Sequence, residues 1–591
     1  MNLSSTIKSI QDIMRKDDGV DGDAQRLGQL TWLLFLKVFD QREEEWEGAQ
    51  SSYSSPLPEL LRWRNWAAFL VGADGRKTPQ KSPAEVIGFI NNELFPQLKE
   101  LDANASPQHK VIRSVFEDAN NYMKSGTQLL AVVEKLEEAI NFHDFKTRAS
   151  LGDVYEQMLN DLRGAGNAGE FYTPRAITQF MADRVNPRLD KRDTVMDPAC
   201  GTGGFLTAAI DHFRNQLRTD PSDIERLAIE KLIHGIEKKQ LPHLLCTTNM
   251  LLHGIDVPSQ IEHRNTLGTL WKEWDANDKV DCIITNPPFG GYEDDGVGSD
   301  YPPNLRTRET ADMFMALIIE KLLKENGRAA VVLPDGFLFG DGIKGELKKL
   351  LLQKCNLHTI IRLPKGVFAP YTSIKTNLLF FTKGSTADND AEHFHTDSIW
   401  FYEHPYPEGY KSYSKTKPIR FEEFKSEQEW WGSEASDFAS RVESEFAWKV
   451  DFKANRERAE TAAKPHWQRA TELNKQTVAL ESEINDLRRS LGTSAKSASH
   501  EKIELQIAEK RLQVEQLRLQ AREAQAAGDR VYWPIYNLDI KNPNSPEEEI
   551  QDPDRLLENY KRLLGEIEET ENRLKSELTA ALAHHFVDED A

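Results

Sequence analysis

The sequence contains little cysteine. Four cysteines occur in 591 residues, they lie far apart in apolar surroundings, and no CxxC pair is present. Thiols spaced in this way favour neither a disulfide framework nor a cysteine-rich zinc site. We therefore expect a protein of a reducing compartment, the cytoplasm.

Long hydrophobic runs are also missing. The best candidate is WLLFL at 32–36, which ends at Lys37, whereas a membrane span needs about 18 apolar residues or more. The first residues, MNLSSTIKSIQDIMRKDD, lack the apolar core and cleavage site of a signal peptide. We expect no membrane association.

The chain has no surplus of positive charge. Lys and Arg number 74 against 95 Asp and Glu, which gives a formal net charge of −21. A polyanion such as DNA is repelled on average by such a chain. If the substrate is a nucleic acid, either the charge is segregated on the surface or a basic partner supplies most of the binding.

The length and patterning predict several domains rather than one. Residues 1–150 are predicted to form a helical N-terminal domain, residues 151–465 a catalytic α/β domain, and residues 466–591 a helical extension. In the middle region, β-rich runs alternate with helical stretches and end in Gly or Pro turns. This alternation predicts a doubly wound, mostly parallel sheet covered by helices. The runs are DTVMDPAC, KLIHGIE, KVDCIITNPP, GRAAVVLPDG, LHTIIRLPKG and TNLLFFTKG.

Heptad spacing marks the C-terminal extension. Apolar residues recur in steps of three and four along 473–491 and again along 503–524, with the polar segment GTSAKSASH between them. Two such helices are expected to fold back as an antiparallel coiled-coil hairpin. A last helix is expected from about Pro553. The extension is either a local bundle or a docking arm for another subunit.

A glycine-rich turn follows the first predicted strand of the middle region. VMDPACGTGGF places Asp197 at the strand end and glycines at 201, 203 and 204 before a helix. Glycines let a ligand approach the backbone closely, although many α/β proteins use such a turn for packing alone. Glu237 ends the next predicted strand, where an acid can accept hydrogen bonds from both ribose hydroxyls of a nucleoside. The alternative is an acid that favours a helix N-terminus.

A third strand, CIIT, ends at Asn286-Pro287-Pro288-Phe289. An exocyclic aromatic amine is a poor nucleophile because its lone pair is delocalised into the ring. The Asn286 side-chain oxygen and the Pro287 carbonyl are two acceptors that can hold such an amine, and the prolines fix φ. Phe289 is placed to stack on a base flipped out of a duplex. The alternative is a plain Pro-Pro turn.

These stretches resemble the S-adenosylmethionine-dependent adenine-N6 DNA methyltransferases, and more narrowly the modification subunit of type I restriction–modification enzymes. The resemblance runs from about residue 30 to 545, in the family's order. It rests on LTWLLFLKVFD, LGDVYEQML, GEFYTPR, DPACGTGGFL, HGIE, RNTLGTL, TNPPFGG, GRAAVVLPDGFLFG, LPKGVFAPYTSIKTNLLFFTK and YNLDIKNPN.

The resemblance implies a Rossmann-like fold and a role for each matched position. Asn286, Pro287, Pro288 and Phe289 match the catalytic motif. Cofactor contacts are implied for Glu170, Phe171, Tyr172, Thr173, Pro174, Arg175, Asp197, Gly201, Thr202, Gly203, Gly204, Glu237 and Asn265. Asn265 stands where Asp is frequent in adenine methyltransferases, and its amide is expected to contact the cofactor adenine.

The family also implies partners. A separate specificity subunit would read double-stranded DNA, two copies of this chain would join it in an M2S1 complex, and a restriction subunit would complete the enzyme. Competing hypotheses are methylation of a protein glutamine, a non-catalytic cofactor-binding scaffold, and a nuclease suggested by Asp335 and Glu346. A Cys200 nucleophile for cytosine-C5 methylation is disfavoured, because no proline immediately precedes it. The paired histidines at 393/395 and 584/585 lack companion ligands, so no metal site is expected.

Overall fold

The computed structural model describes residues 3–49, 51–140, 172–217, 221–385, 393–493, 497–544 and 553–585, together with Gly152, Tyr155, Glu156 and Leu159. The chain divides into two compact units, Met1–Lys541 and Asn542–Ala591. Among the helices of these ranges, none combines the length and apolar character needed to cross a membrane.

The N-terminal region is built from helices around one apolar core. The segment LGQLTWLLFLKVF is apolar on every side, so the helix α2 that carries it is buried from Leu27 to Asp40. A short antiparallel hairpin of β1 (Phe69–Val71) and β2 (Lys77–Pro79) interrupts the helices, which the expectation of an all-helical region missed. The helices are α1 (Leu3–Met14), α2 (Gly22–Ala49), α3 (Trp63–Trp66), α4 (Pro83–Phe89), α5 (Phe95–Lys99), α6 (Pro107–Phe116) and α7 (Gly126–Ala139). The stretch DFKTRASLGDVYEQML is also predicted to be helical from its sequence, but most of it lies outside the described residues.

The second region contains a nine-stranded sheet in the order β11-β10-β8-β9-β7-β6-β3-β4-β5. Strand β9 is antiparallel to β7 and β8, β11 is antiparallel to β10, and the other neighbours are parallel. The six predicted runs are confirmed as β3, β4, β6, β7, β8 and β9, whereas β5, β10 and β11 were not foreseen. The strands are β3 (Val195–Asp197), β4 (Ile233–Glu237), β5 (Ile261–His263), β6 (Val280–Thr285), β7 (Leu323–Pro334), β8 (Cys355–Arg362), β9 (Thr376–Lys383), β10 (Ser398–Glu403) and β11 (Ala447–Asp451).

Both faces of the sheet are buried, as the continuous apolar runs require. In β9, Leu378 and Phe380 enter one core while Leu379 and Phe381 enter the other, because successive side chains point to opposite faces. Helices α9, α10 and α12 pack on the first face and α13 and α15 on the second, which confirms the doubly wound class. The α-helices described between residues 175 and 430 are α9 (Arg175–Val185), α10 (Gly204–Asn215), α11 (Asp223–Glu230), α12 (Gln240–Leu252), α13 (Thr310–Leu317), α14 (Asp335–Phe339), α15 (Ile343–Lys354) and α16 (Lys425–Trp430).

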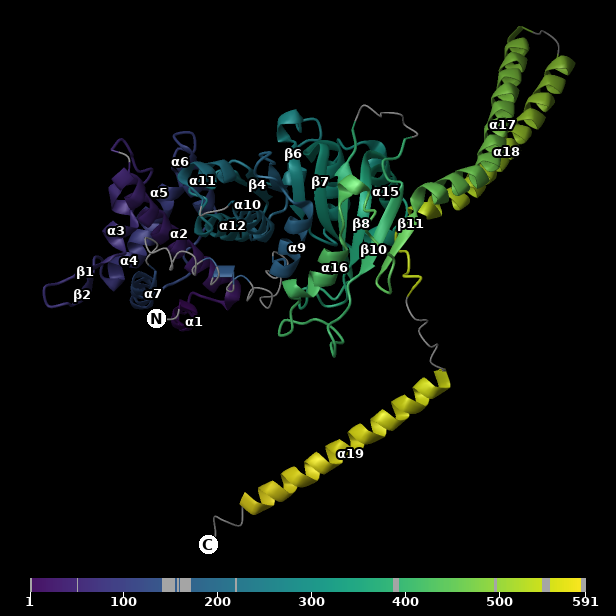
Figure 1. Cartoon of the computed structure of the whole chain (residues 1–591). Coiled ribbons are helices and arrows are strands. Elements are labelled where there is room, and N and C mark those ends of the chain that lie inside the picture. Colours follow the sequence, from purple (N-terminus) through teal and green to yellow (C-terminus); the bar gives the residue numbers. More distant parts are fainter. Residues whose placement is uncertain are drawn as a thin grey trace. The chain divides into compact units, whose positions relative to one another are not determined.

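Helix α12 joins the two regions. Its Leu244, Leu245, Leu251 and Leu252 belong to the N-terminal core, while Cys246 and Met250 pack under the sheet. The N-terminal helices therefore lie beside the β4–β5 end of the sheet (Figure 1). Two hydrophobic cores thus share helix α12, which fixes their relative position within the first unit.

The heptad segments form the predicted antiparallel hairpin, α17 (Phe452–Thr493) with α18 (Ser497–Tyr532). The helices extend further into GTSAKSASH than expected, and only 494–496 lie outside the described residues. At the hairpin root, Trp467 meets Tyr532 at 5.1 Å between ring centroids, and Tyr536 and Leu538 are buried in the core under the sheet. The last predicted helix is α19 (Pro553–His585), in the second unit.

Candidate active site

Three neighbouring parallel strands end at one cavity. Strands β6, β3 and β4 adjoin in the sheet, and their carboxyl ends carry Asn286, Asp197 and Glu237. Ligands of open α/β sheets bind at this edge, where the strand order reverses. The cavity has a volume of about 290 Å³. Its walls include Thr173, Asp197, Pro198, Ala199, Cys200, Gly201, Thr202, Gly204, Phe205, Glu237, Lys238, Lys239, Asn265, Thr266, Asn286, Pro288, Phe289, Gly291, Tyr292, Glu293, Thr310, Phe314 and Tyr371.

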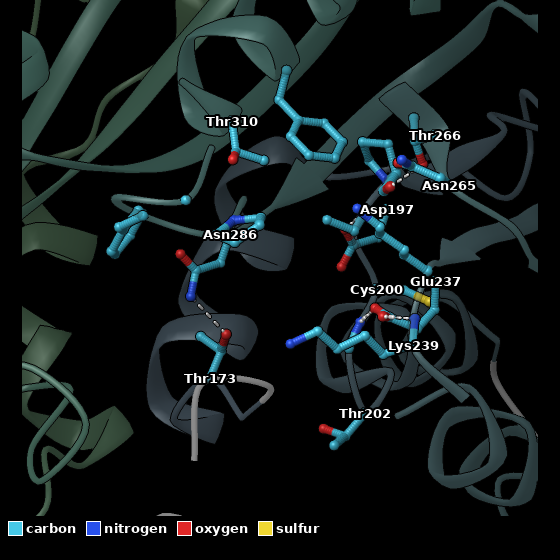
Figure 2. Close-up of a pocket in the computed structure, with 18 of the residues that line it drawn as sticks. Thr173, Asp197, Cys200, Thr202, Glu237, Lys239, Asn265, Thr266, Asn286 and Thr310 are labelled. Carbon is cyan, nitrogen blue, oxygen red and sulfur yellow. Dashed lines mark hydrogen bonds between the residues drawn. The ribbon is translucent and has the colours of Figure 1, made fainter. Parts of the chain in front are cut away.

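The predicted residues therefore approach one space from two sides. Asn286 and Thr173 lie on one side of the cavity, and Asp197, Glu237 and Asn265 lie on the other (Figure 2). Pro287 and Gly203 are adjacent in the chain to cavity residues but do not line the cavity themselves.

The glycine turn has two left-handed residues with different roles. Gly201 has φ 53° and borders the cavity. Gly203 has φ 82°, and a Cβ at this position would lie 2.8 Å from the Cys246 sulfur on α12. For Gly203 the structure shows close helix packing, the alternative that the sequence left open, while its predicted role in cofactor binding stays a prediction.

Glu237 is buried and holds the turn. Its Oε2 accepts from the Gly201 backbone N–H at 2.9 Å, and its Oε1 accepts from the Lys239 N–H at 2.7 Å. Burial raises the pKa of this carboxyl, against the lowering effect of the two backbone N–H groups. Each oxygen retains acceptor capacity, because a carboxylate offers about four lone-pair sites.

Asp197 connects the glycine turn to β6, the strand that precedes Asn286. Its Oδ1 accepts from the Thr285 hydroxyl at 2.6 Å and from the Ala199 N–H at 3.1 Å. Its Oδ2 has no hydrogen-bond partner among the described residues. Burial raises the pKa of Asp197 to about 7, and the charge of Glu237 adds to this effect.

The Asn286 side chain is anchored by one hydrogen bond. Its Nδ2 donates to the Thr173 hydroxyl at 3.1 Å. Its buried Oδ1 has no partner in the part of the chain that the structure describes. Because an unsatisfied buried carbonyl costs about 1–3 kcal/mol, this oxygen is an acceptor that is available for a ligand.

Aromatic side chains border the cavity beside Asn286. The Phe289 ring meets Phe368 edge to face at 6.5 Å between centroids, and Tyr371 lines the same cavity. Phe368 and Tyr371 belong to the segment between β8 and β9. This segment belongs to the motif LPKGVFAPYTSIKTNLLFFTK, for which no functional role was predicted.

The EFYTPR segment is only partly at the cavity. Glu170 and Phe171 lie outside the described residues, and Thr173 is the member that lines the cavity. Tyr172 is buried in the N-terminal core. Pro174 precedes α9, and Arg175 donates to Asp211 on α10 at 3.5 Å.

Several residues of the cavity wall were not among the site residues predicted from the sequence. Lys238, Thr266, Glu293, Thr310 and Phe314 come from loops or from helix α13. Glu293 follows the NPPFGG stretch by two residues, so proximity to the motif was the signal that could have revealed it.

The described residues give no support to a Cys200 nucleophile or to a nuclease site. The pKa of the Cys200 thiol is raised by its hydrogen bond to Cys246, 3.7 Å between sulfurs, and by burial, so a thiolate nucleophile is disfavoured. Asp335 accepts from Asn377 at 2.7 Å. Within the described ranges, no three His, Cys, Asp or Glu side chains are arranged to hold a metal ion.

Comparison with protein families decides the relationship. A family model described as N-6 DNA Methylase matches residues 146–475, more than half of the chain. The chain belongs to the N-6 DNA methylase family. A second model, described as the HsdM N-terminal domain, matches residues 3–136 of this methylase.

Individual relatives place the methylase among the type I methylase subunits. It is 48% identical over 585 residues to the type I restriction enzyme EcoEI methylase subunit of Escherichia coli, covering 99% of each chain. The EcoKI methylase subunit of E. coli K12 is 29% identical over 72% of this chain and 75% of its own length.

Solved structures agree with this placement. A modification subunit assigned to a type I restriction enzyme from Vibrio vulnificus YJ016 is 38% identical, with a TM-score of 0.62 over 77% of this chain and 92% of that one. A chain solved in work on assembly of the type I R-M system is 29% identical, with a TM-score of 0.67 over 97% and 98%.

Proposed function

We propose that this methylase transfers a methyl group from S-adenosylmethionine to N6 of adenine in double-stranded DNA, as the modification subunit of a type I restriction–modification complex. The observation that carries the proposal is the buried Asn286 oxygen, which has no partner among the described residues and lies on the same cavity as Glu237, Gly201, Thr202 and Gly204. The donor side and the acceptor side of a transfer reaction thus share one cavity.

The cavity suits the proposed cofactor. When bound, S-adenosylmethionine supplies an electrophilic methyl group on a sulfonium. Glu237 would accept from the ribose hydroxyls with the lone pairs that Gly201 and Lys239 leave open. The absence of a side chain at Gly201 leaves room beside the backbone. The free Asp197 Oδ2 is a further acceptor for the cofactor.

On the other side, Asn286 would hold the target amine. Its Oδ1 and the Pro287 carbonyl would accept the two N6 hydrogens, and the Thr173 hydroxyl anchors the side chain by accepting from the Asn286 Nδ2. The lone pair of the nitrogen is then directed at the methyl group. Phe289 would stack on the flipped base. The nitrogen becomes acidic as it gains the methyl group, so the transfer itself requires no carboxylate base.

Product analysis tests this function against its rivals. The reconstituted complex is incubated with methyl-labelled cofactor and duplex DNA, and the DNA is digested to nucleosides. We expect label in N6-methyl-2′-deoxyadenosine. Label in protein glutamine would indicate the rival methyltransferase, and binding of cofactor without transfer would indicate a scaffold. Either result would contradict the proposal.

The proposal includes the subunits of the complex. A specificity subunit would read the DNA, two copies of this chain would join it as M2S1, and a restriction subunit would add cleavage. The net charge of −21 agrees with a DNA grip that is supplied largely by a partner. The proposal also places the protein in the cytoplasm, where its DNA substrate lies.

Helix α19 is the segment that we assign to the specificity subunit. Its exposed Leu557, Tyr560, Leu564, Ile567, Leu574 and Leu578 follow a heptad seam that is interrupted by Glu571. A heptad seam is typical of a helix that packs against another helix.

The structure defines a suitable truncation. A deletion from residue 466 would also remove Tyr536 and Leu538 from the core, whereas a deletion of 542–591 follows the boundary between the units. Removing 542–591 should abolish co-purification with the specificity subunit and leave binding of S-adenosylhomocysteine within about threefold. Leu564→Asp with Ile567→Asp should weaken assembly, while Thr570→Asp beside the seam should not. Intact assembly after the deletion would refute the assignment.

A further inference from the structure

Asn265 does not present a free amide to the cavity. Its Oδ1 accepts from the Leu267 N–H at 3.1 Å, and its Nδ2 donates to Glu293 Oε2 at 3.1 Å. Rotating the amide by 180° would set its NH2 against an N–H and its oxygen against a carboxylate, so both partners fix this orientation. Asn265, whose amide is expected to contact the cofactor adenine, therefore also donates to a neighbouring carboxylate.

Glu293 is that carboxylate, and it lines the cavity. It is 6% exposed, and Lys238 donates to both of its oxygens at 3.2 and 3.0 Å. In the described chain, Lys238 is the sole donor to Oε1, so Oε1 keeps acceptor capacity. Lys238 directly follows Glu237, which places Glu293 next to the proposed ribose site.

The backbone of Glu293 is anchored. Its N–H donates to the Arg308 carbonyl at 3.0 Å, and the Arg308 guanidinium donates back to the Glu293 carbonyl at 3.0 and 3.1 Å. Thr310, at the start of α13, donates its N–H to Gly291 at 3.0 Å. The carboxylate is therefore held at a fixed position on the wall, as a selective contact requires.

We propose that Glu293 is a specificity residue for the cofactor: its carboxylate accepts a hydrogen bond from the exocyclic amine of the purine, and Asn265 and Lys238 hold it in position. This inference rests on the proposed function. A 6-amino group donates to a carboxylate, whereas a 6-oxo group would oppose its charge. Glu293 thus selects an adenine cofactor over its deaminated counterpart. Residue 265 is an amide rather than an acid, so Glu293 supplies the carboxylate for this contact.

The test measures binding rather than turnover. The full-length chain is titrated calorimetrically with S-adenosylhomocysteine and with S-inosylhomocysteine, which differ at the purine 6-position. The wild type should prefer the adenosyl compound by about tenfold or more, the scale of a hydrogen bond to a charged group. Glu293→Gln, which can donate to a 6-oxo group, should reduce or reverse this preference.

Matched variants distinguish recognition of the purine by Glu293 from a purely structural role of its ion pair with Lys238. Glu293→Asp keeps the charge opposite Lys238 but shortens the side chain, and it should also narrow the preference. Asp294→Asn, at the exposed neighbouring residue, should leave it unchanged. Glu237→Gln should weaken both compounds equally. Equal affinities for the wild type, or an unchanged ratio in both Glu293 variants, would overturn the Glu293 assignment alone. Failure of the wild type to bind either compound would instead overturn the proposed function, and this inference with it.

Discussion

Replacing Thr173 by Val should lower the rate of methyl transfer without removing the cofactor. Thr173 accepts the Asn286 Nδ2 hydrogen at 3.1 Å, and Val keeps the shape of the side chain but removes that acceptor. The Asn286 side chain then loses the hydrogen bond that anchors it, and its oxygen is no longer held toward the base.

The size of the effect follows from one hydrogen bond. Loss of such a bond costs about 0.5–1.5 kcal/mol net, which corresponds to a roughly two- to tenfold lower kcat. Thr173→Ser restores the hydroxyl and should recover most of the rate. The assay is single-turnover methylation of duplex DNA by the reconstituted complex at saturating cofactor, with the affinity for S-adenosylhomocysteine measured in parallel.

The pattern of results is diagnostic. A full rate for Thr173→Val would show that the amide needs no such orientation. A large loss of cofactor affinity with an unchanged rate would place Thr173 in cofactor binding instead. Failure of Ser to rescue would point to packing rather than to the hydroxyl.

Two further predictions concern stability. Burial raises the pKa of Asp197 to about 7, against about 3.9 for an exposed Asp. The protonated carboxyl therefore contributes its full share to the free energy of unfolding below about pH 4, and this contribution is lost as the pH rises through 7. The Tm of the wild type relative to Asp197→Asn should therefore fall between pH 5 and pH 8, and parallel pH profiles in differential scanning calorimetry would contradict this. Gly203→Ala should destabilise the protein more than Gly290→Ala by about 1–3 kcal/mol, the range for overpacking. Both glycines have positive φ, but only at Gly203 would the added Cβ lie 2.8 Å from the Cys246 sulfur. Equal free energies of unfolding for the two variants would show that helix α12 moves to accommodate the added methyl group.

Local patterns predicted much of the fold. The six predicted strands are apolar runs of β-branched and large residues that end in a polar residue or a turn, and the mixed, mostly parallel sheet buries both of their faces. The hairpin seam was readable because heptad spacing has one low-energy arrangement. Strands β10 and β11 were missed, because their aromatic, turn-rich surroundings lack a clean period.

The site was predictable where it lies at strand ends and not where loops meet. Asp197, Glu237 and Asn286 each end a strand, and the parallel arrangement brings them together. The Asn286–Thr173 and Asn265–Glu293 contacts join segments 113 and 28 residues apart. Such pairings depend on how loops fold over the sheet, and no periodicity records them.

The central claim is that the Asn286 oxygen acts on the base while the opposite wall holds the cofactor. Asn286→Ala in the reconstituted complex tests it most directly, with N6-methyladenine formation and S-adenosylhomocysteine affinity measured on the same preparation. We expect methylation to fall by about a hundredfold or more, as when an essential transition-state contact is removed, with affinity for S-adenosylhomocysteine within about threefold of the wild type. Methylation at a near wild-type rate, or loss of both properties together in a folded protein, would contradict the account.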